Sequence, residues 1–266
     1  MTDAPLLELR NIWKRFAAIQ VLRGVSMTVR AGEVTALVGD NGAGKSTLIK
    51  GIAGIHHFDD GDVVWEGRKV EITHPKMASE IGIEFVYQDL ALCDNLDVMQ
   101  NMFLGRERHR DVSFGAKTFR GLFLDEGSME EAARDTLTGL SVTTVRSVRQ
   151  KVAGLSGGQR QAVAVAKAVM WNSKLVVLDE PTAALGVAQT KQVLSLIRRL
   201  ADRGLGVIYI SHNLEDVLKV ADSIAVLRLG KLVAQPDRKD VNSQQLVELI
   251  TTGQSASRLP AAPARA

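Results

Sequence analysis

The sequence predicts an α/β fold built around a largely parallel β-sheet. Short apolar runs of strand length, such as VTALV at 34–38 and LVVLDE at 175–180, lie between longer stretches with helical periodicity. Strands and helices that alternate along a chain form parallel sheets, because each helix carries the chain back to the same edge. A second observation is the glycine-rich segment GDNGAGKST at 39–47, which follows the first apolar run directly and leads into a helical pattern.

The N-terminal part of the chain predicts strands on both sides of this glycine loop. Apolar and polar residues alternate in the first two segments, which is typical of strands in a partly exposed sheet. A helix is expected to start near Lys45, where the glycines end. The predicted strands are 6–12, 21–30, 34–38 and 84–87, with a hairpin at 63–72 that turns at Glu66-Gly67.

The middle of the chain has a different character. From about 90 to 152 the pattern is mostly helical and polar, with an irregular piece at 111–121. We expect this region to be an insertion into the α/β core. Short apolar strands return between helices at 174–180, 206–212 and 223–235, and the Ala/Pro-rich tail at 254–266 is expected to be disordered.

The composition indicates a globular protein in a reducing compartment. Hydrophobic residues make up 45% of the chain, and 33 Lys and Arg against 30 acidic residues leave a net charge of +3. So small an excess predicts no nucleic-acid partner. Cys93 is the single cysteine, so no disulfide can form within the chain, and its apolar neighbours predict a small buried side chain. Charges at Asp3, Glu8 and Arg10 argue against a signal peptide, and no run approaches the roughly 18 apolar residues of a membrane span.

The glycine loop matches the phosphate-binding pattern G-x4-G-K-[ST] in full. Its glycines allow backbone N–H groups to surround phosphates, while the lysine places a positive charge on the β and γ oxygens. The serine hydroxyl is the expected ligand of Mg²⁺. The predicted nucleotide-binding residues are Gly39, Asp40, Asn41, Gly42, Ala43, Gly44, Lys45, Ser46 and Thr47.

A second acidic motif complements the loop. In LVVLDE, apolar residues predict a buried strand that ends at Asp179. This carboxylate is expected to hold the Mg²⁺ shell beside the phosphates. Glu180 follows it, where it could accept a proton from an attacking water.

A third motif, LSGGQRQ at 155–161, precedes an Ala/Val-rich helix and offers another helix N-terminus to negative charge. The phosphate loop, LSGGQ and LVVLDEPT occur in that order, and from about 6 to 253 the chain resembles the ATP-binding cassette of ABC transporters. The resemblance implies a P-loop NTPase core with a mixed, mostly parallel sheet, N-terminal antiparallel strands and a helical subdomain inserted at about 90–165. It also implies that two cassettes pack head to tail, so that LSGGQ contacts the ATP of the partner. The residues that would act in this way are Ser156, Gly157, Gly158 and Gln159.

Further positions match the family's motifs. Gln88, at the end of EFVY, resembles the glutamine that contacts Mg²⁺ and the attacking water. His212, which ends GVIYISH, resembles the histidine that contacts the γ-phosphate. Phe16, in KRFAAIQVL, resembles the aromatic residue that stacks on adenine, although a phenylalanine between two strands could equally belong to the core.

One position departs from the family pattern. Most cassettes follow the EPT motif with a segment that ends in Leu-Asp, whereas EPTAALG places Gly186 where that aspartate would stand. The change removes a polar contact across the dimer and leaves Asp179 and Glu180 in place. We expect an active ATPase in which the two sites are less tightly coupled.

Finer details resemble the cassettes of monosaccharide importers for ribose, xylose and fructose. The segments that carry this likeness are VYQDLALCDNL (86–96), MQNMFLGRE (99–107), PTAALG and YISHNLEDV (209–217). The resemblance implies a homodimer of cassettes bound to an integral membrane permease on the cytoplasmic face of the inner membrane. A periplasmic or extracellular sugar-binding protein would act through that permease. The charged run GRERHRD (105–111) is expected to be a solvated loop, or else a contact with the permease or with anionic lipid.

Two alternatives stay open at this point. One is a soluble cassette ATPase of DNA repair or translation, although those proteins usually have two cassettes or long coiled-coil insertions. The other is a nucleotide-binding regulator with weak hydrolysis, which Gly186 favours and which Glu180 and His212 oppose.

Overall fold

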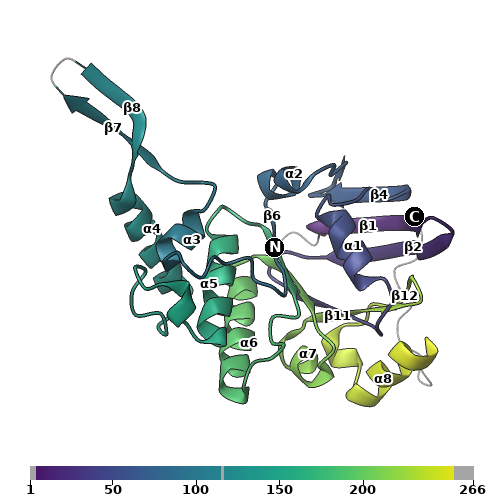
Figure 1. Ribbon diagram of the computed structural model, residues 1–266. Coiled ribbons are helices and arrows are strands. Elements are labelled where there is room, and N and C mark those ends of the chain that lie inside the picture. Colours follow the sequence, from purple (N-terminus) through teal and green to yellow (C-terminus); the bar gives the residue numbers. More distant parts are fainter. Residues whose placement is uncertain (1–3, 115–116, 255–266) are drawn as a thin grey trace.

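The computed structural model describes residues 4–114 and 117–254 and confirms the predicted α/β fold (Figure 1). The strands are β1 (Leu7–Phe16), β2 (Ile19–Val29), β3 (Val34–Val38), β4 (Asp60–Trp65), β5 (Arg68–Val70), β6 (Ile83–Val86), β7 (His109–Phe114), β8 (Lys117–Leu124), β9 (Leu175–Asp179), β10 (Gly206–Ile210), β11 (Ser223–Arg228) and β12 (Lys231–Ala234). The α-helices are α1 (Lys45–Ile52), α2 (Pro75–Glu80), α3 (Val98–Phe103), α4 (Glu126–Gly139), α5 (Gly157–Val169), α6 (Val187–Asp202), α7 (Leu214–Val220) and α8 (Ser243–Thr252), with 3₁₀ turns at Val152–Gly154 and Arg238–Asp240.

A six-stranded sheet forms the centre of the molecule, in the order β12-β11-β3-β10-β9-β6. Its strands pair in parallel except for β12, which is antiparallel to β11. Strands β3, β9 and β10 are short and almost fully buried, which explains why the sequence shows them as unbroken apolar runs.

A second, antiparallel sheet has the order β2-β1-β4-β5. Its exposed and buried residues alternate, as the sequence of β1 and β2 predicts. The hairpin between β4 and β5 turns at Glu66-Gly67, and both residues have positive φ values, 48° and 77°. Such a turn matches the right-handed twist of the two strands.

The core consists of two hydrophobic clusters, one on each face of the six-stranded sheet. Successive residues of β9 point to opposite faces, so Val176 and Leu178 join one cluster and Leu175 and Val177 join the other. The first cluster includes side chains of α5, α6 and α7. The second includes Leu48 and other residues of α1, together with side chains of the antiparallel sheet. Helix α1 is therefore clamped between two sheets.

The inserted region contains α3 and α4, which pack with α5, and also a feature that the sequence analysis missed. Strands β7 and β8 form an antiparallel hairpin where an irregular piece of a mostly helical insertion was predicted. Aromatic and β-branched residues in KTFRGLFL favour a strand, and Gly105 and Gly121 interrupt helical periodicity. The hairpin projects from the body of the molecule at the end that carries α4 (Figure 1).

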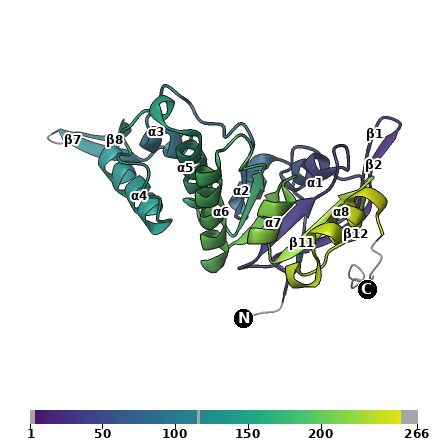
Figure 2. The ribbon, with the colours of Figure 1, turned by 90° about the horizontal axis from the view of Figure 1, so that it is seen from below.

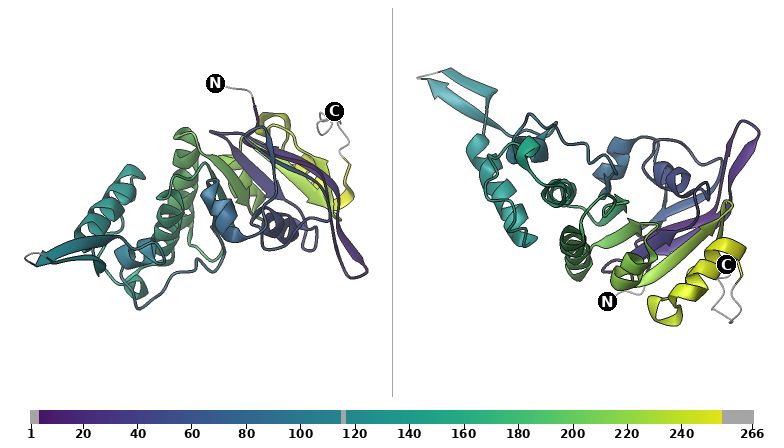
Figure 3. Two further views of the ribbon diagram at one scale, coloured as in Figure 1. Left: turned by 90° about the horizontal axis from the view of Figure 1, so that it is seen from above. Right: turned by 60° about the horizontal axis from the view of Figure 1, so that its bottom comes forward.

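Views from other directions show the same arrangement of the two ends. The helices α3, α4 and α5 lie at one end and the antiparallel sheet at the other (Figures 2 and 3).

Cys93 is partly exposed, which corrects the expectation of a buried side chain. Within the described ranges, none of the helices is both long and apolar enough to cross a membrane. The tail predicted to be disordered lies outside the described residues from 255 onward.

Candidate functional site

The predicted site residues follow the carboxyl ends of neighbouring parallel strands. In the register of the sheet, Ile210 of β10 lies beside Leu37 of β3 and also beside Asp179 of β9. Val86 of β6 lies beside Leu178 of β9. Parallel strands end at one edge, so the sheet brings together Gly39, Gln88, Asp179, Glu180 and His212, each within two residues of its strand's end.

The glycine loop joins β3 to α1, and its backbone requires glycine. Gly39, Gly42 and Gly44 have φ values of 154°, 79° and 107°, in the range that side chains disfavour. A Cβ atom at Gly39 would stand only 2.1 Å from the carbonyl oxygen of Leu227. Lys45 begins α1, and its ammonium donates hydrogen bonds to the carbonyls of Gly39 at 2.6 Å and Asp40 at 3.1 Å. The loop therefore folds around its own lysine.

Glu180 occupies a strained backbone position at the end of β9. Its φ is 51°, in the left-handed region, which is uncommon for a residue with a side chain. Its N–H donates to the carbonyl of Ile210 at 3.0 Å, which holds the turn against β10. Its carboxylate lies 2.9 Å from Nδ1 of His212. The side chain of His212 is 76% exposed, whereas that of Glu180 is 18% exposed, so the pair faces solvent through the imidazole.

Charges at this edge perturb each other. Burial raises the pKa of Asp179, and the neighbouring charge of Glu180 raises it further, while Lys45 and Lys50 oppose the shift. Burial lowers the pKa of Lys45, against the attraction of Glu180, Asp40 and Asp179. Asp179, Glu180 and Lys45 are therefore close enough to shift one another's pKa values. Perturbed pKa values of this kind are typical of sites that bind a charged ligand.

Gln88 and Phe16 are both exposed and come from different elements. Gln88 is exposed two residues after β6. Phe16 ends β1 with 43% of its surface exposed, which excludes the core position that the sequence left open. Its ring meets the edge of His56 at a centroid distance of 5.3 Å and an angle of 89°. Sequence reasoning missed His56, because nothing in its spacing connects it to a strand that precedes it by some forty residues.

The LSGGQ motif forms a capped helix start. Ser156 is the N-cap of α5; its hydroxyl accepts from the N–H of Gln159 at 3.4 Å, and the amide of Gln159 accepts from the N–H of Ser156 at 2.8 Å. This reciprocal pair is a capping box. Ser156 and Gly157 are exposed, and a Cβ at Gly157 would lie 3.0 Å from Leu185. The turn at Ser156 and Gly157 is thus presented to solvent at the N-terminus of α5.

The two glycine motifs do not meet within one chain. Helix α5 stands in the helical part of the molecule, apart from α1, in both Figure 1 and Figure 2. Across the described ranges, no hydrogen bond or ion pair joins 155–161 to the loop at 39–47. The structure therefore places Asp179, Glu180 and His212 beside the phosphate loop, Gln88 after the outermost strand of the same sheet edge, and LSGGQ in a different part of the molecule.

Gly186 is the N-cap of α6 and has an ordinary extended backbone, with φ at −71° and ψ at 161°. A Cβ atom built there would meet no atom within 4 Å. Neither backbone conformation nor space in the single chain explains the glycine.

Comparisons with known proteins agree with this geometry. Residues 22–183 match the family model described as "ABC transporter". The chain is 45% identical to a xylose/arabinose import ATP-binding protein of Sulfolobus acidocaldarius, over 93% of this chain and 94% of that protein. It is 42% identical to a fructose import ATP-binding protein of Rhizobium meliloti, over 97% of this chain and 98% of that protein. It spans 47% of a ribose import ATP-binding protein of Rubrobacter xylanophilus, at 40% identity over 92% of this chain.

Solved structures show the same fold. An ATP-binding cassette of an ABC transporter in its ADP conformation superposes with a TM-score of 0.75, at 26% identity over 94% of this chain and 96% of that one. The family model covers more than half of the chain, and relatives above 40% identity match it along nearly their whole length. The chain therefore belongs to the ABC transporter family, as one of its ATP-binding proteins.

Proposed function

We propose that this protein is the ATP-hydrolysing subunit of an importer that moves a monosaccharide through a separate permease. The observation that supports the proposal is that the phosphate loop, Asp179, Glu180, His212 and Gln88 follow the ends of neighbouring parallel strands along one sheet edge. The substrate class rests on the full-length relatives, which are named for xylose/arabinose and for fructose import.

The phosphate loop would hold the nucleotide through backbone N–H groups and Lys45. In the ligand-free chain the ammonium of Lys45 is held by two carbonyls of the loop. Phosphate oxygens bind a cation more strongly than neutral carbonyls do, so Lys45 would turn from these carbonyls to the β and γ oxygens. Phe16, exposed at the end of β1, would offer its ring to the adenine.

Glu180 and His212 would have separate roles at the γ-phosphate. Glu180 would accept a proton from the attacking water, and His212 would contact the phosphate that leaves. The 2.9 Å hydrogen bond between the two side chains supports this division, because it fixes the orientation of the imidazole from one side. Gln88 would orient the same water from β6.

The donor set at this edge fits Mg²⁺. Mg²⁺ prefers oxygen ligands and usually takes only one or two carboxylates, the rest of its shell being water and phosphate oxygens. Asp179, the hydroxyl of Ser46 and the amide of Gln88 supply such oxygens, and no group of three or more carboxylate, imidazole or thiol ligands occurs among the described residues. Bound Mg²⁺ would neutralise phosphate charge, and the raised pKa of Asp179 is consistent with a carboxylate that lacks a full countercharge.

The separation of LSGGQ from the phosphate loop supports a homodimer. A second copy in head-to-tail orientation would place its Ser156 turn on the ATP of the first, so that each nucleotide joins two chains. The permease would hold the dimer at the cytoplasmic face of the membrane, and a sugar-binding protein on the other side would deliver the sugar. We propose that the protein acts without a nucleic-acid partner.

Uptake by intact cells tests the proposal. Cells in which Lys45→Ala replaces the chromosomal copy should lose uptake of one or a few sugars from a labelled panel of pentoses and hexoses. Lys239→Ala, which removes an exposed lysine of the 3₁₀ turn at Arg238–Asp240, is the control and should leave uptake unchanged. Unchanged uptake of every sugar in Lys45→Ala cells would exclude the import function.

A further inference from the structure

The loop that follows Gln88 runs alongside the segment that leads into LSGGQ. The carbonyls of Asp94 and Leu96 accept hydrogen bonds from the N–H groups of Ala153 and Val152, at 3.1 and 3.0 Å. In the other direction, the N–H of Val98 donates to the carbonyl of Gln150 at 3.1 Å. Two segments some fifty residues apart in sequence are thus joined by backbone bonds.

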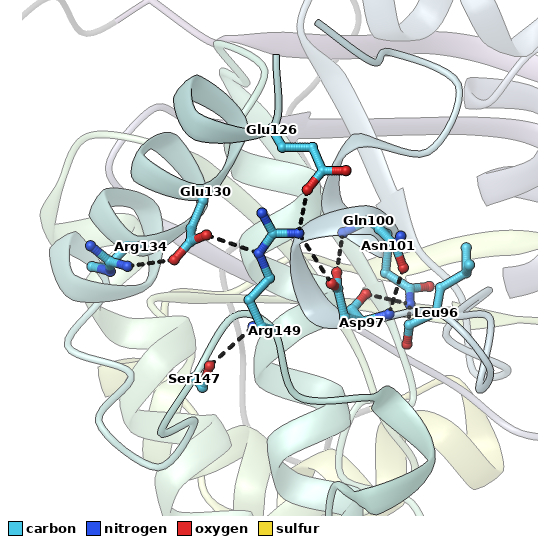
Figure 4. Close-up of polar contacts among 9 residues, drawn as sticks. All are labelled: Leu96, Asp97, Gln100, Asn101, Glu126, Glu130, Arg134, Ser147 and Arg149. Carbon is cyan, nitrogen blue, oxygen red and sulfur yellow. Dashed lines mark hydrogen bonds and ion pairs between the residues drawn. The ribbon is translucent and has the colours of Figure 1, made fainter. Parts of the chain in front are cut away.

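Asn101 holds the first of these segments in place. Its side chain is fully buried, and its Oδ1 accepts from the N–H of Cys93 at 2.7 Å. Its Nδ2 donates to the carbonyl of Cys93 at 2.9 Å. The same nitrogen donates to the carbonyl of Asp97 at 2.9 Å and lies 3.4 Å from that of Leu96 (Figure 4). The side-chain amide of Asn101 therefore forms hydrogen bonds with the backbone at both ends of the loop at 93–97.

The second segment is held by arginines. Arg160, directly after LSGGQ, forms an ion pair with Asp94 at 2.9 Å and also donates to the carbonyls of Ala153 and Leu155, both at 3.3 Å. Arg149 bonds Glu126 at 2.9 Å and Glu130 at 2.8 Å on α4, and lies 3.8 Å from Asp97 (Figure 4). These contacts fasten the segment before Ser156 to the loop at 93–97.

We propose that Asn101 is a positioning residue for LSGGQ: by fixing the loop at 93–97, it sets where the Ser156 turn stands relative to the partner's ATP. The inference rests on the proposed shared nucleotide and names a residue that touches neither ATP nor LSGGQ itself. Because the same loop begins just after Gln88, Asn101 also ties the position of LSGGQ to the element that faces the chain's own γ-phosphate.

The amide chemistry makes this role testable with a near-isosteric change. Asn101→Asp keeps an oxygen for the N–H of Cys93 and loses every bond that Nδ2 donates. Carbonyl oxygens of Cys93 and Asp97 then face a carboxylate, so the loop must shift. At a catalytic site, a displacement of about 1 Å lowers the reaction rate by roughly 10²-fold, so a shift of this size at the Ser156 turn should be measurable.

The experiment compares binding by one chain with assembly of two. ATP affinity of the monomer and ATP-dependent dimerisation are measured for Glu180→Gln alone and with Asn101→Asp added. We expect ATP affinity to change less than about twofold while the dimer dissociation constant rises by roughly tenfold or more. The single thiol, Cys93, should react faster with a thiol reagent in the Asn101→Asp chain, which reports the loosened loop.

Two further variants keep the result interpretable. Arg160→Lys, at the surface, retains a charge for Asp94 and loses the fork that reaches the carbonyls, so it should weaken dimerisation in the same sense even if Asn101→Asp fails to fold. Gln192→Glu, an exposed amide on α6, should change neither property. Unchanged dimerisation in both Asn101→Asp and Arg160→Lys, or an equal loss of monomer ATP affinity, would overturn the inference. A monomeric Glu180→Gln parent would instead contradict the shared nucleotide.

Discussion

The ammonium of Lys45 sits among groups that pull its charge in opposite directions. Burial lowers its pKa, while Glu180, Asp40 and Asp179 favour the charged form. Two loop carbonyls hold it in the absence of ligand. The residue is thus partly desolvated before ATP arrives, and its interaction with phosphate is stronger than that of a fully solvated lysine.

Lys45→Ala should lower ATP hydrolysis by roughly 10²–10³-fold, the usual effect of removing one donor aimed at developing charge. Monomer ATP affinity should also fall, because no other side-chain cation is expected on the β and γ oxygens. Lys239→Ala removes an exposed lysine from the 3₁₀ turn at Arg238–Asp240 and should change neither property. Near wild-type turnover in purified Lys45→Ala would exclude the phosphate-loop assignment.

Asp179→Asn tests a carboxylate whose pKa the fold raises. A raised pKa means that the folded state binds this proton more tightly than the unfolded state does. Protonated Asp179 therefore stabilises the fold fully at pH values below the pKa of the unfolded state. This stabilisation is lost as pH rises through the pKa of the folded state. At pH 7 the ionised Asp179 therefore destabilises the ligand-free protein. Asn should raise the melting temperature at pH 7, with a smaller gain at pH 4, while Mg²⁺ affinity in the presence of ATP falls by about 10- to 100-fold. A lower melting temperature at pH 7 would contradict the pKa argument.

Most residues of the candidate site could be predicted, because their motifs follow short apolar strands whose parallel pairing leaves little choice of edge. Pairings between side chains could not. The contact of Glu180 with His212 depends on the register of β9 and β10, and the contact of Phe16 with His56 depends on how the antiparallel sheet meets α1. Neither is encoded in local spacing.

Among the elements, α6 begins in an unusual way. Its N-cap is Gly186, which provides no side-chain acceptor for the first N–H groups, and only the amide of Gln189 reaches back, at 3.4 Å. Gly at an N-cap is weaker than Asp, and an acidic group at a helix start also interacts favourably with the helix dipole.

Gly186→Asp should therefore stabilise the chain, by about 0.3–1 kcal/mol, as measured by urea unfolding. The open space around this position predicts no steric cost. ATPase activity should be retained or rise modestly, since the aspartate restores a polar group common in the wider family. Gly186→Ala is the control, with neither gain. Complete loss of activity in a folded Gly186→Asp protein would show that the dimer itself needs glycine there.

The strands of the core could be placed from apolar runs and from alternation of polarity, whereas the β7–β8 hairpin could not. Its segment is polar and charged at 105–111, lies between helices, and contributes nothing to either core cluster among its described residues. The sequence of this segment shows no regular alternation of polar and apolar residues that would predict a strand, and turn signals such as Gly121 indicate only that a helix ends.

On the scale of the whole molecule, the two glycine-rich turns lie in different parts of the structure. One lies between β3 and α1, and the other caps α5 in the helical part (Figure 1). A single chain cannot close both on one nucleotide without a large rearrangement. In the proposed head-to-tail dimer a second chain would place its Ser156 turn on the same nucleotide, and ATP would then be part of the interface.

Ser156→Arg should separate the two roles. The bulky cation removes the cap of α5 and obstructs the partner's γ-phosphate position, so hydrolysis and ATP-dependent dimerisation should both be lost. Monomer ATP affinity should stay within about twofold, because the phosphate loop lies elsewhere, and loss of the cap costs about 0.5–2 kcal/mol of stability. Ser156→Thr, which can still cap the helix, serves as the control. Loss of monomer affinity as severe as in Lys45→Ala would contradict action on the partner's nucleotide.

The central claim, that each ATP joins two chains and is hydrolysed with Glu180 as base, is tested most directly by size-exclusion chromatography of Glu180→Gln. Glutamine preserves the size of the side chain but accepts no proton, so turnover should fall by roughly 10²–10⁴-fold and ATP should remain bound. Removing a carboxylate also relieves repulsion of the γ-phosphate. At low salt we expect Glu180→Gln to be a dimer with ATP and a monomer with ADP. Glu215→Gln, an exposed control on α7, should form no trapped dimer. A Glu180→Gln protein that binds ATP and still elutes as a monomer would contradict the account.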